Sequence, residues 1–441
     1  MEYNVTLSWF GIVRLGIVQM ALGSIIAIAS STFNRVMVVE LSLLQVIPGL
    51  LLALHYFIQI TRPNWGFLSD RGGNRVFWII IGISILGIGS VLACFGIKYF
   101  MVNYYLGIFI SVLAYSLIGV GVGAAGTSLL ALIATNTPNH RKAAAATITW
   151  IMMIFGAAIT AIFVGQIIDP YSIGKLIRIV TYLSIFWFVF SIIALYKIDG
   201  KTSRSTTKNA APTKKSTDTF FIGLKQVLSE KNTRWFTIFV FLSMTAYFMQ
   251  EPILEPYAGI VFQFTVGEST QLTGYHQGGI LLGMLLVGLS VSGFQVGSLR
   301  FWVLLGCTGS GLTLILIAIL GQVIASKLSL MICICSLGFF NGTFAVGAIG
   351  SMMHLAGVGI AKREGTRMGL WGAGQAVAAG IAMIFSTLFV DVLQLITKNT
   401  ATSYGIIFTI EGILFLAAAA LTTKLVSDSS RESKSYNGGQ I

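Results

Sequence analysis

Charged residues are scarce in this sequence. They make up 10% of the 441 residues, whereas 55% of the residues are hydrophobic. A soluble domain carries about 25% charged residues, so a chain this apolar needs lipid rather than water as its solvent. The scarcity of charge therefore excludes a water-soluble protein and indicates a protein embedded in a membrane.

Cysteine and histidine, two residue types that often hold metal ions, are also few, with four of each. Cys94, Cys307, Cys333 and Cys335 all lie in apolar runs, and no histidine or further cysteine stands near the Cys333-x-Cys335 pair. Small apolar packing residues are the better interpretation of these cysteines. The cysteines therefore predict no metal-binding site.

Apolar runs long enough to cross a membrane recur along the whole chain. A helix needs about 20 apolar residues to cross the hydrocarbon core. The runs cover residues 10–33, 43–62, 75–97, 104–134, 144–167, 176–197, 235–257, 275–294, 301–323, 328–355, 367–390 and 403–425. The pattern predicts twelve transmembrane helices.

The longest hydrophilic gap divides these runs into two sets of six. We therefore predict an N-terminal six-helix half over residues 1–198 and a cytoplasmic linker over 199–233. A C-terminal six-helix half follows over 234–426, with a polar tail over 427–441. The linker is rich in Lys, Ser and Thr, which is typical of a flexible connection.

Positive charge predicts the orientation of the chain. The formal net charge is +13, and most basic residues lie in alternate short loops, in the linker and near the C-terminus. The opposite side holds only Lys98, Lys175, Arg178, Lys327 and Lys398. Because cytoplasmic loops carry the excess of Lys and Arg, both termini are predicted to be cytoplasmic. The basic charge is thus a topology signal rather than a nucleic-acid site.

The two halves resemble each other at an offset of 224 residues. Two parallel six-helix halves joined by a cytoplasmic linker are typical of the major facilitator superfamily. We therefore predict an all-α membrane protein with this fold, in two pseudo-symmetric six-helix halves. The matched positions are Gly73 and Gly297, Phe77 and Phe301, Trp78 and Trp302, Gly82 and Gly306, Gly123 and Gly347, and Gly126 and Gly350.

The loop after the second run contains Gly66, Asp70, Arg71, Gly73 and Arg75. It resembles the loop motif of the major facilitator superfamily. Asp70 is expected to pair with a basic residue or a helix N-terminus across the two halves in one conformation and to release it in another. A tight turn with inside-positive charge is the alternative. The corresponding loop of the second half lacks the acid, so such a latch would be one-sided.

Four further stretches narrow the resemblance. They are 14–19 (RLGIVQ), 33–41 (FNRVMVVEL), 251–259 (EPILEPYAG) and 369–376 (GLWGAGQA). Together with the loop motif they resemble the PucC/LhaA family, a branch of the major facilitator superfamily. The resemblance extends from about Arg14 to the last apolar run.

The resemblance implies a function. Members of this family assist the assembly of light-harvesting or other chlorophyll-binding membrane proteins, and bind or deliver chlorophyll or bacteriochlorophyll, with or without carotenoid. The implied partners are membrane lipid, chlorophyll-binding apoproteins and pigment-synthesis enzymes, and no nucleic acid. The implied location is a photosynthetic membrane, either thylakoid or intracytoplasmic. No catalytic residue is implied, and magnesium would enter only within the pigment.

Charged residues stand at the predicted non-cytoplasmic ends of the first and seventh runs. They are Arg35, Glu40, Glu251 and Glu255. Charges at membrane depth are costly unless they are paired or hydrated. We expect Arg35 to pair with Glu255 or Glu40, either as a gate or docking point between the halves or as an interfacial salt bridge that sets helix packing.

Chlorophyll-type pigments need an axial ligand for magnesium, for which neutral histidine, amide oxygen or water can serve. His55 lies deepest in an apolar run and is the leading candidate, followed by His354 and His276. Asn341 and Gln375 are weaker candidates. A hydrogen-bonded histidine between helices is the alternative interpretation of His55.

Aromatic residues make up 12% of the chain. Flat macrocycles stack on such rings, although aromatic residues are also common at membrane interfaces. Trp150 and Trp371 lie on the fifth and eleventh runs, which are expected to flank the cleft between the halves. We therefore include both as pigment-contact candidates.

Two other function classes compete with pigment handling. A secondary transporter of a small, largely apolar solute would need titratable residues near the midplane, and Asp169, Asp199 and Asp391 lie at the ends of runs. A pigment prenyltransferase would need paired aspartates for magnesium diphosphate, and Asp70 supplies only one. The acids thus favour a non-catalytic assembly factor.

Overall fold

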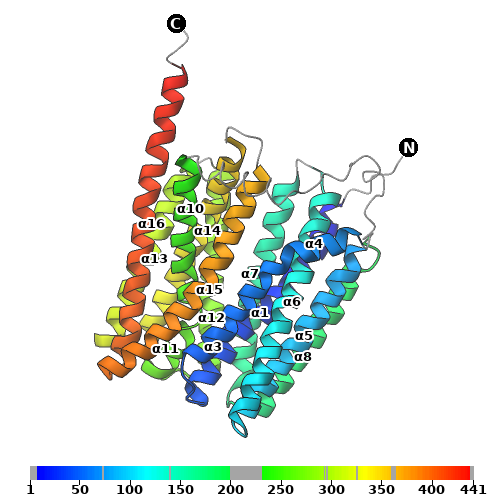
Figure 1. Ribbon diagram of the computed structural model, residues 1–441, viewed down its shortest axis with the longest axis vertical. Coiled ribbons are helices and arrows are strands. Elements are labelled where there is room, and N and C mark those ends of the chain that lie inside the picture. Colours follow the sequence, from blue (N-terminus) through cyan, green and yellow to red (C-terminus); the bar gives the residue numbers. More distant parts are fainter. Residues whose placement is uncertain are drawn as a thin grey trace.

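The computed structural model describes residues 7–71, 74–138, 141–198, 231–292, 294, 296–323, 326–358 and 364–437. The elements in this part of the chain are helices (Figure 1). The first half contains α1 (Trp9–Ser30), α2 (Thr32–Arg35), the π-helix η1 (Val36–Glu40), α3 (Val46–Ile58), the 3-10 helix η2 (Gln59–Thr61), α4 (Arg62–Arg71), α5 (Arg75–Phe100), α6 (Tyr104–Asn136), α7 (Lys142–Ile168) and α8 (Ile173–Leu195). The second half contains α10 (Lys231–Met249), α11 (Leu254–Val261), α12 (Val266–Ser292), α13 (Leu299–Val323), α14 (Lys327–Val358), α15 (Glu364–Thr397) and α16 (Thr400–Asn437).

The number of spans is close to the expected twelve. Eleven helices in the described ranges are long and apolar enough to cross a membrane. The expected run 43–62 is a shorter apolar helix over Val46–Thr61, which passes into the more polar α4. The predicted count of twelve is therefore approximate, because this element falls below the usual spanning length of about 20 residues.

The predicted element boundaries need four corrections. The expected run 275–294 begins too late, because α12 starts at Val266, where Thr265 and Glu268 exchange hydrogen bonds as a capping box. The run 235–257 is interrupted after Met249 at a turn that contains Pro252. The last residues of the predicted linker belong to α10, and α16 continues through the predicted polar tail to Asn437.

Two hydrophobic cores follow the two halves. The larger cluster consists almost wholly of side chains from α1 to α8, and the second consists of side chains from α10 to α16. Figure 1 shows the blue-to-cyan helices on one side of the molecule and the green-to-red helices on the other. The fold is therefore two helical bundles with separate cores, as the sequence repeat predicts.

Glycines that recur at the offset of 224 residues make the same close helix contact in each half. A Cβ atom on Gly82 of α5 would lie 2.5 Å from the backbone nitrogen of Ala125 on α6. A Cβ atom on Gly306 of α13 would lie 2.4 Å from the backbone nitrogen of Phe344 on α14. Small residues let membrane helices approach this closely. The repeat thus preserves the same helix contact in each half.

A carboxylate of the second half caps a helix of the first. Asp391 on α15 accepts hydrogen bonds from the backbone nitrogens of Gln45 (3.0 Å) and Val46 (2.8 Å), where α3 begins. The first N–H groups of a helix have no partner within the helix, and a carboxylate is favoured there by the helix dipole. The start of α3 is therefore stabilised by the other half.

The first half caps a helix of the second in the same way. Asp169, which follows α7, accepts hydrogen bonds from the hydroxyl of Thr265 (2.5 Å) and the backbone nitrogen of Gly267 (3.0 Å) at the start of α12. Helices α3 and α12 occupy corresponding places in the two halves. We name the two carboxylates with these helix N-termini the reciprocal caps.

Further hydrogen bonds between the halves surround the reciprocal caps. The side-chain nitrogen of Gln45 donates to the carbonyl of Pro252 (2.7 Å), and its oxygen accepts from Tyr404 (2.8 Å). Asn34 donates to the same carbonyl, and Thr32 bonds Thr270 (3.1 Å). These contacts lie near α11 and the start of α3, at the lower end in Figure 1 and away from the end of α16. They form a seal between the halves at this end.

Neutralising either capping carboxylate should open the seal. In Asp391→Asn or Asp169→Asn, an amide group that cannot accept both hydrogen bonds replaces the carboxylate. Loss of one charge-assisted hydrogen bond should raise the open population about tenfold. The measurement is the rate at which a membrane-impermeant maleimide labels Ser31→Cys, which replaces a buried residue at the seal, in a chain without its native cysteines.

Lys398→Met is the matched control, because it removes an exposed charge at the same end of the molecule. Its labelling rate should equal that of the parent chain. Equal rates in the parent and in both folded aspartate variants would show that the caps do not hold the seal closed.

Candidate functional site

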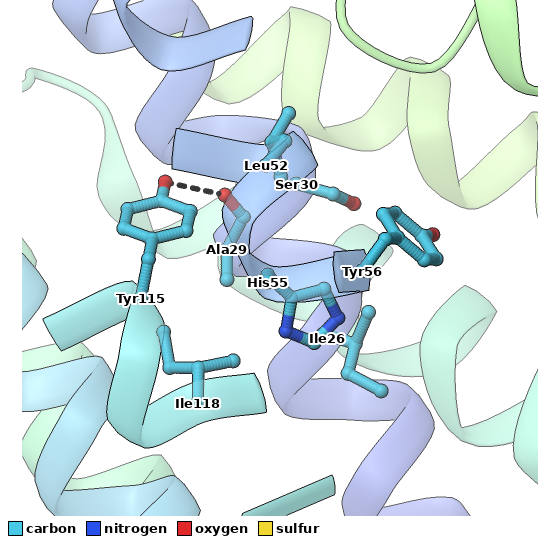
Figure 2. A pocket seen from close by; sticks show the side chains of 8 residues that line it. All are labelled: Ile26, Ala29, Ser30, Leu52, His55, Tyr56, Tyr115 and Ile118. Carbon is cyan, nitrogen blue, oxygen red and sulfur yellow. Dashed lines mark hydrogen bonds between the residues drawn. The ribbon is translucent and has the colours of Figure 1, made fainter. Parts of the chain in front are cut away.

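A small cavity lies inside the first half, among α1, α3 and α6 (Figure 2). Its volume is about 10 Å³, which is enough for about one water molecule. Its lining consists of Ile26, Ala29, Ser30, Leu52, His55, Tyr56, Tyr115 and Ile118.

His55 is the most polar group of this lining. Its side chain is 3% exposed, and Figure 2 shows the ring among apolar neighbours that include Ile26 and Ile118. The nearby Tyr115 hydroxyl is already satisfied, because it donates to the carbonyl of Ala29 (3.0 Å).

A chain of hydrogen bonds sets the tautomer of His55. Arg62 donates to the side-chain oxygen of Gln59, and arginine has no acceptor atom. The amide nitrogen of Gln59 therefore faces His55, with 2.9 Å between the two Nε2 atoms. Because this amide nitrogen donates, Nε2 of His55 accepts and the proton lies on Nδ1.

The Nδ1–H group of His55 is an unpaired donor. Nδ1 is buried and has no hydrogen-bond partner among the described residues. A protonated ring nitrogen has no lone pair for a metal, and the lone pair of Nε2 is taken by Gln59. His55 therefore stays a predicted magnesium ligand, and it would have to give up its hydrogen bond to Gln59 to bind the metal through Nε2.

Tyr56 connects the cavity with the seal. It lines the cavity and donates a hydrogen bond to Glu251 of the second half (3.0 Å). Its ring also meets Phe248 edge-on, with 5.3 Å between the ring centres. Ser30, another lining residue, interacts with the same carboxylate. Glu251 is therefore a contact between the halves beside the cavity.

The other charged candidates are divided between the halves. Arg35 is 2% exposed, pairs with Glu40 of the same half at 2.5 Å, and reaches across the seal to the carbonyl of Phe264 (2.9 Å). Glu255 accepts from Thr273 within the second half. Of the two expected pairs, the structure forms Arg35–Glu40, and Arg35 contacts the other half through a carbonyl instead of Glu255.

The second half also buries a histidine beside an amide. His276 lies inside α12 instead of opening a helix, and its Nε2 atom is 3.3 Å from the amide nitrogen of Asn341. The oxygen of Asn341 accepts from Ser310 (2.8 Å). A serine hydroxyl can donate or accept, so this chain of hydrogen bonds does not set the tautomer of His276 as Arg62 does for His55.

The remaining candidates lie apart from the cavity lining. Trp150 on α7 is 42% exposed, and Gln375 on α15 is half-buried. Arg75 of the loop motif is buried and donates to the carbonyl of Ala131 (2.8 Å) and to Thr135, which attaches α5 to α6. Gly66 lies within α4. The side chains of Asp70, Arg71, His354 and Trp371, together with Gly73, fall outside the described residues.

Glu411 is an acid that the sequence analysis did not consider, because only acids at the ends of apolar runs were named there. It lies well inside α16, is 0% exposed, and neither carboxylate oxygen has a hydrogen-bond partner in the described ranges. An acid in the middle of an apolar run is a functional candidate by default, which was the signal for it in the sequence. Glu411 therefore weakens the argument that midplane acids are lacking.

Comparisons with known proteins agree on the family. The family described as PUCC protein matches residues 32–430. The protein named Bacteriochlorophyll synthase 44.5 kDa chain, from Rhodobacter capsulatus, is 48% identical over 422 residues, which cover 96% of each chain. Protein PucC from Cereibacter sphaeroides is 27% identical and covers 94% of this chain and 92% of its own.

Solved structures share the fold. A nucleoside transporter matches with a TM-score of 0.69 at 13% identity, covering 94% of this chain and 99% of its own. A peptide transporter matches with a TM-score of 0.68 at 14% identity, covering 96% and 98%. At these identities the likeness shows only the fold, which is that of the major facilitator superfamily. Because the family match covers most of its length, this multi-pass membrane protein belongs to the PucC protein family.

Proposed function

We propose that this chain is an assembly factor for light-harvesting or other bacteriochlorophyll-binding membrane proteins. It holds or delivers the pigment while the apoproteins insert, with or without carotenoid. The observation that carries the proposal is the 48% identity, over nearly the whole of both chains, to a protein named as a bacteriochlorophyll synthase chain. That name favours bacteriochlorophyll over chlorophyll, and an intracytoplasmic or inner membrane over a thylakoid.

The word synthase in that name raises the question of catalysis. We propose that the chain carries pigment and does not catalyse its synthesis. The lining of the cavity supports this role, because none of its residues is an acid of the kind that prenyl transfer requires. Partners in this role are the apoproteins of pigment-binding complexes and the enzymes that complete the pigment.

The halves 1–198 and 234–426, the linker 199–233 and the cytoplasmic termini belong to the same proposal. With both termini cytoplasmic, the seal closes the side away from the enzymes that supply pigment. Pigment would then approach from the cytoplasmic side or from the lipid. His55, His276, His354, Asn341 and Gln375 stay candidates for a magnesium ligand, and Trp150 and Trp371 for stacking.

A transporter of a small, largely apolar solute is the second candidate function. Two observations favour it: the fold matches those of transporters, and Glu411 is a buried acid in a membrane helix with no hydrogen-bond partner among the described residues. Such acids serve as proton sites in many transporters. The two functions differ in whether Glu411 is needed.

Bound pigment is the first test of the assembly role. The protein, purified in mild detergent from pigmented membranes, should show the absorption bands of a bacteriochlorophyll and should retain small antenna polypeptides. A transporter of the same fold, purified in parallel, controls for pigment dissolved in the micelle. Colourless protein without antenna polypeptides would contradict the proposal.

Glu411→Gln separates the two functions, because the amide keeps the shape of the side chain and cannot carry a proton. If the chain is an assembly factor, bound pigment and the amount of antenna complex in cells should stay within about twofold of the parent. Glu411→Asp is the matched control, since it retains an acid. Loss of antenna complex in Glu411→Gln, with recovery in Glu411→Asp, would favour the proton-coupled transporter instead.

A further inference from the structure

Arg14 connects two helix ends on the side of the first half that is remote from the seal. Helix α1 ends beside the seal and α8 begins just after Asp169, so the start of α1 and the end of α8 lie at the opposite end. The guanidinium of Arg14 crosses from α1 and donates to the carbonyl of Tyr196, which directly follows α8. Its central carbon lies 5.9 Å from the centre of the Phe10 ring. Neither the seal nor the cavity explains this arginine.

Lys197, the next residue after Tyr196, has an unfavourable backbone conformation. Its φ angle is 58°, in the left-handed region that often follows a helix and that glycine adopts without steric cost. The ammonium group lies 5.3 Å from the centre of the Tyr196 ring. A lysine in a position that suits glycine indicates that its charge has a use at this place.

The positive charges at this end lack protein counter-ions among the described residues. Neither Arg14 nor Lys197 forms an ion pair with a described carboxylate, and the same holds for Arg141, whose guanidinium lies 5.1 Å from the centre of the Trp9 ring. A guanidinium carries five N–H donors, and the carbonyl of Tyr196 is the one acceptor for Arg14 in the described ranges. The remaining donors are therefore available to an anion from outside the protein.

Exposed apolar side chains extend from these charges toward the middle of the membrane. Val189, Ile192, Ile193 and Tyr196 are all exposed, and their spacing of three and four residues places them on one face of α8. Val13 adds an exposed apolar side chain beside Arg14 on α1. A free phosphate ion would gain nothing from this face, whereas a phospholipid would place its phosphate at the charges and its acyl chains along the face.

We propose that Arg14 and Lys197 bind the phosphate of an anionic phospholipid, whose acyl chains lie along the exposed face of α8. The guanidinium supplies parallel N–H donors that match two phosphate oxygens, and the ammonium adds a second positive charge. The site lies at the end that is predicted to be cytoplasmic, and cytoplasmic leaflets carry anionic lipid. The inference is independent of the proposed function, because it concerns the lipid around the chain and not the pigment.

Native mass spectrometry of the full chain in mild detergent tests the site. The chain, freed of co-purified lipid, is titrated with phosphatidylglycerol, which is anionic, and with phosphatidylcholine of the same acyl chains, which has no net charge. The parent should bind the first phosphatidylglycerol about tenfold more tightly than phosphatidylcholine. Lys197→Gly and Arg14→Gln should each weaken phosphatidylglycerol binding about fivefold. Equal binding of the two lipids by the parent would overturn the proposal.

Arg178→Gln is the matched control, because it removes an exposed arginine near the other end of α8. Its affinity for phosphatidylglycerol should equal that of the parent. Lys197→Gly guards against misfolding, since glycine suits the φ angle at this position. If Arg14 serves only to join α1 to α8, Lys197→Gly will bind phosphatidylglycerol as the parent does, and that result would refute the lipid site. Competition by inorganic phosphate would also refute it, because it would reveal a site for a free anion.

Phosphatidylglycerol with a diazirine on an acyl chain locates the bound lipid. Illumination should attach it to residues 189–193 of α8 in the parent chain. Labelling of this segment should fall about fivefold in Lys197→Gly and stay unchanged in Arg178→Gln. Adducts confined to other helices, or equal labelling of α8 in the parent and in Lys197→Gly, would overturn the proposal. Whether the chain binds pigment does not affect any of these outcomes.

Discussion

The free N–H groups at the start of two helices constrain the whole arrangement. Helices α3 and α12 begin near the membrane surface, where unpaired backbone donors are costly. Each is satisfied by a carboxylate of the other half, Asp391 for α3 and Asp169 for α12. The halves can therefore part at this end only if water replaces these bonds. The seal is pseudo-symmetric because the repeat places an acid at the end of the same helix in each half.

The seal and the cavity share a residue, so they cannot change independently. Tyr56 forms part of the cavity wall and donates to Glu251 across the interface. A ligand that displaced Tyr56 would break its hydrogen bond to Glu251. Binding energy in the first half is thereby able to weaken a contact with the second, which is the requirement for a ligand to shift a conformational equilibrium. This holds whether the ligand is carried across the membrane or handed to another protein within it.

Much of the fold follows from patterns visible in the chain, while the site depends on the direction of individual hydrogen bonds. Gly82 and Gly306 reveal the repeat because close helix contacts admit only small residues. The spacing of His55, Gln59 and Arg62 on successive helical turns is also visible. Spacing alone, however, cannot say that Arg62 points back to Gln59, and without this bond His55 is equally well a metal ligand.

The hydrogen-bond partners of Asp391 and Asp169 could not be predicted either, because each partner lies far from its aspartate in the sequence. Glu411 could have been found, because an acid inside an apolar run is unusual in any membrane helix.

The two halves place similar polar groups in unequal settings. Each buries a histidine on corresponding helices, α3 and α12, beside an amide: Gln59 of η2 for His55 and Asn341 of α14 for His276. Only in the first half does an arginine set the direction of the hydrogen bonds, and there the histidine lines a cavity. The second half instead buries Glu411, which has no hydrogen-bond partner in the part of the chain that the structure describes. In a carrier whose halves alternate around a central substrate, a ligand contacts both. The two halves therefore cannot offer equivalent polar contacts to one ligand. This asymmetry within a symmetric fold fits the proposed assembly role better than a carrier that alternates around a central substrate.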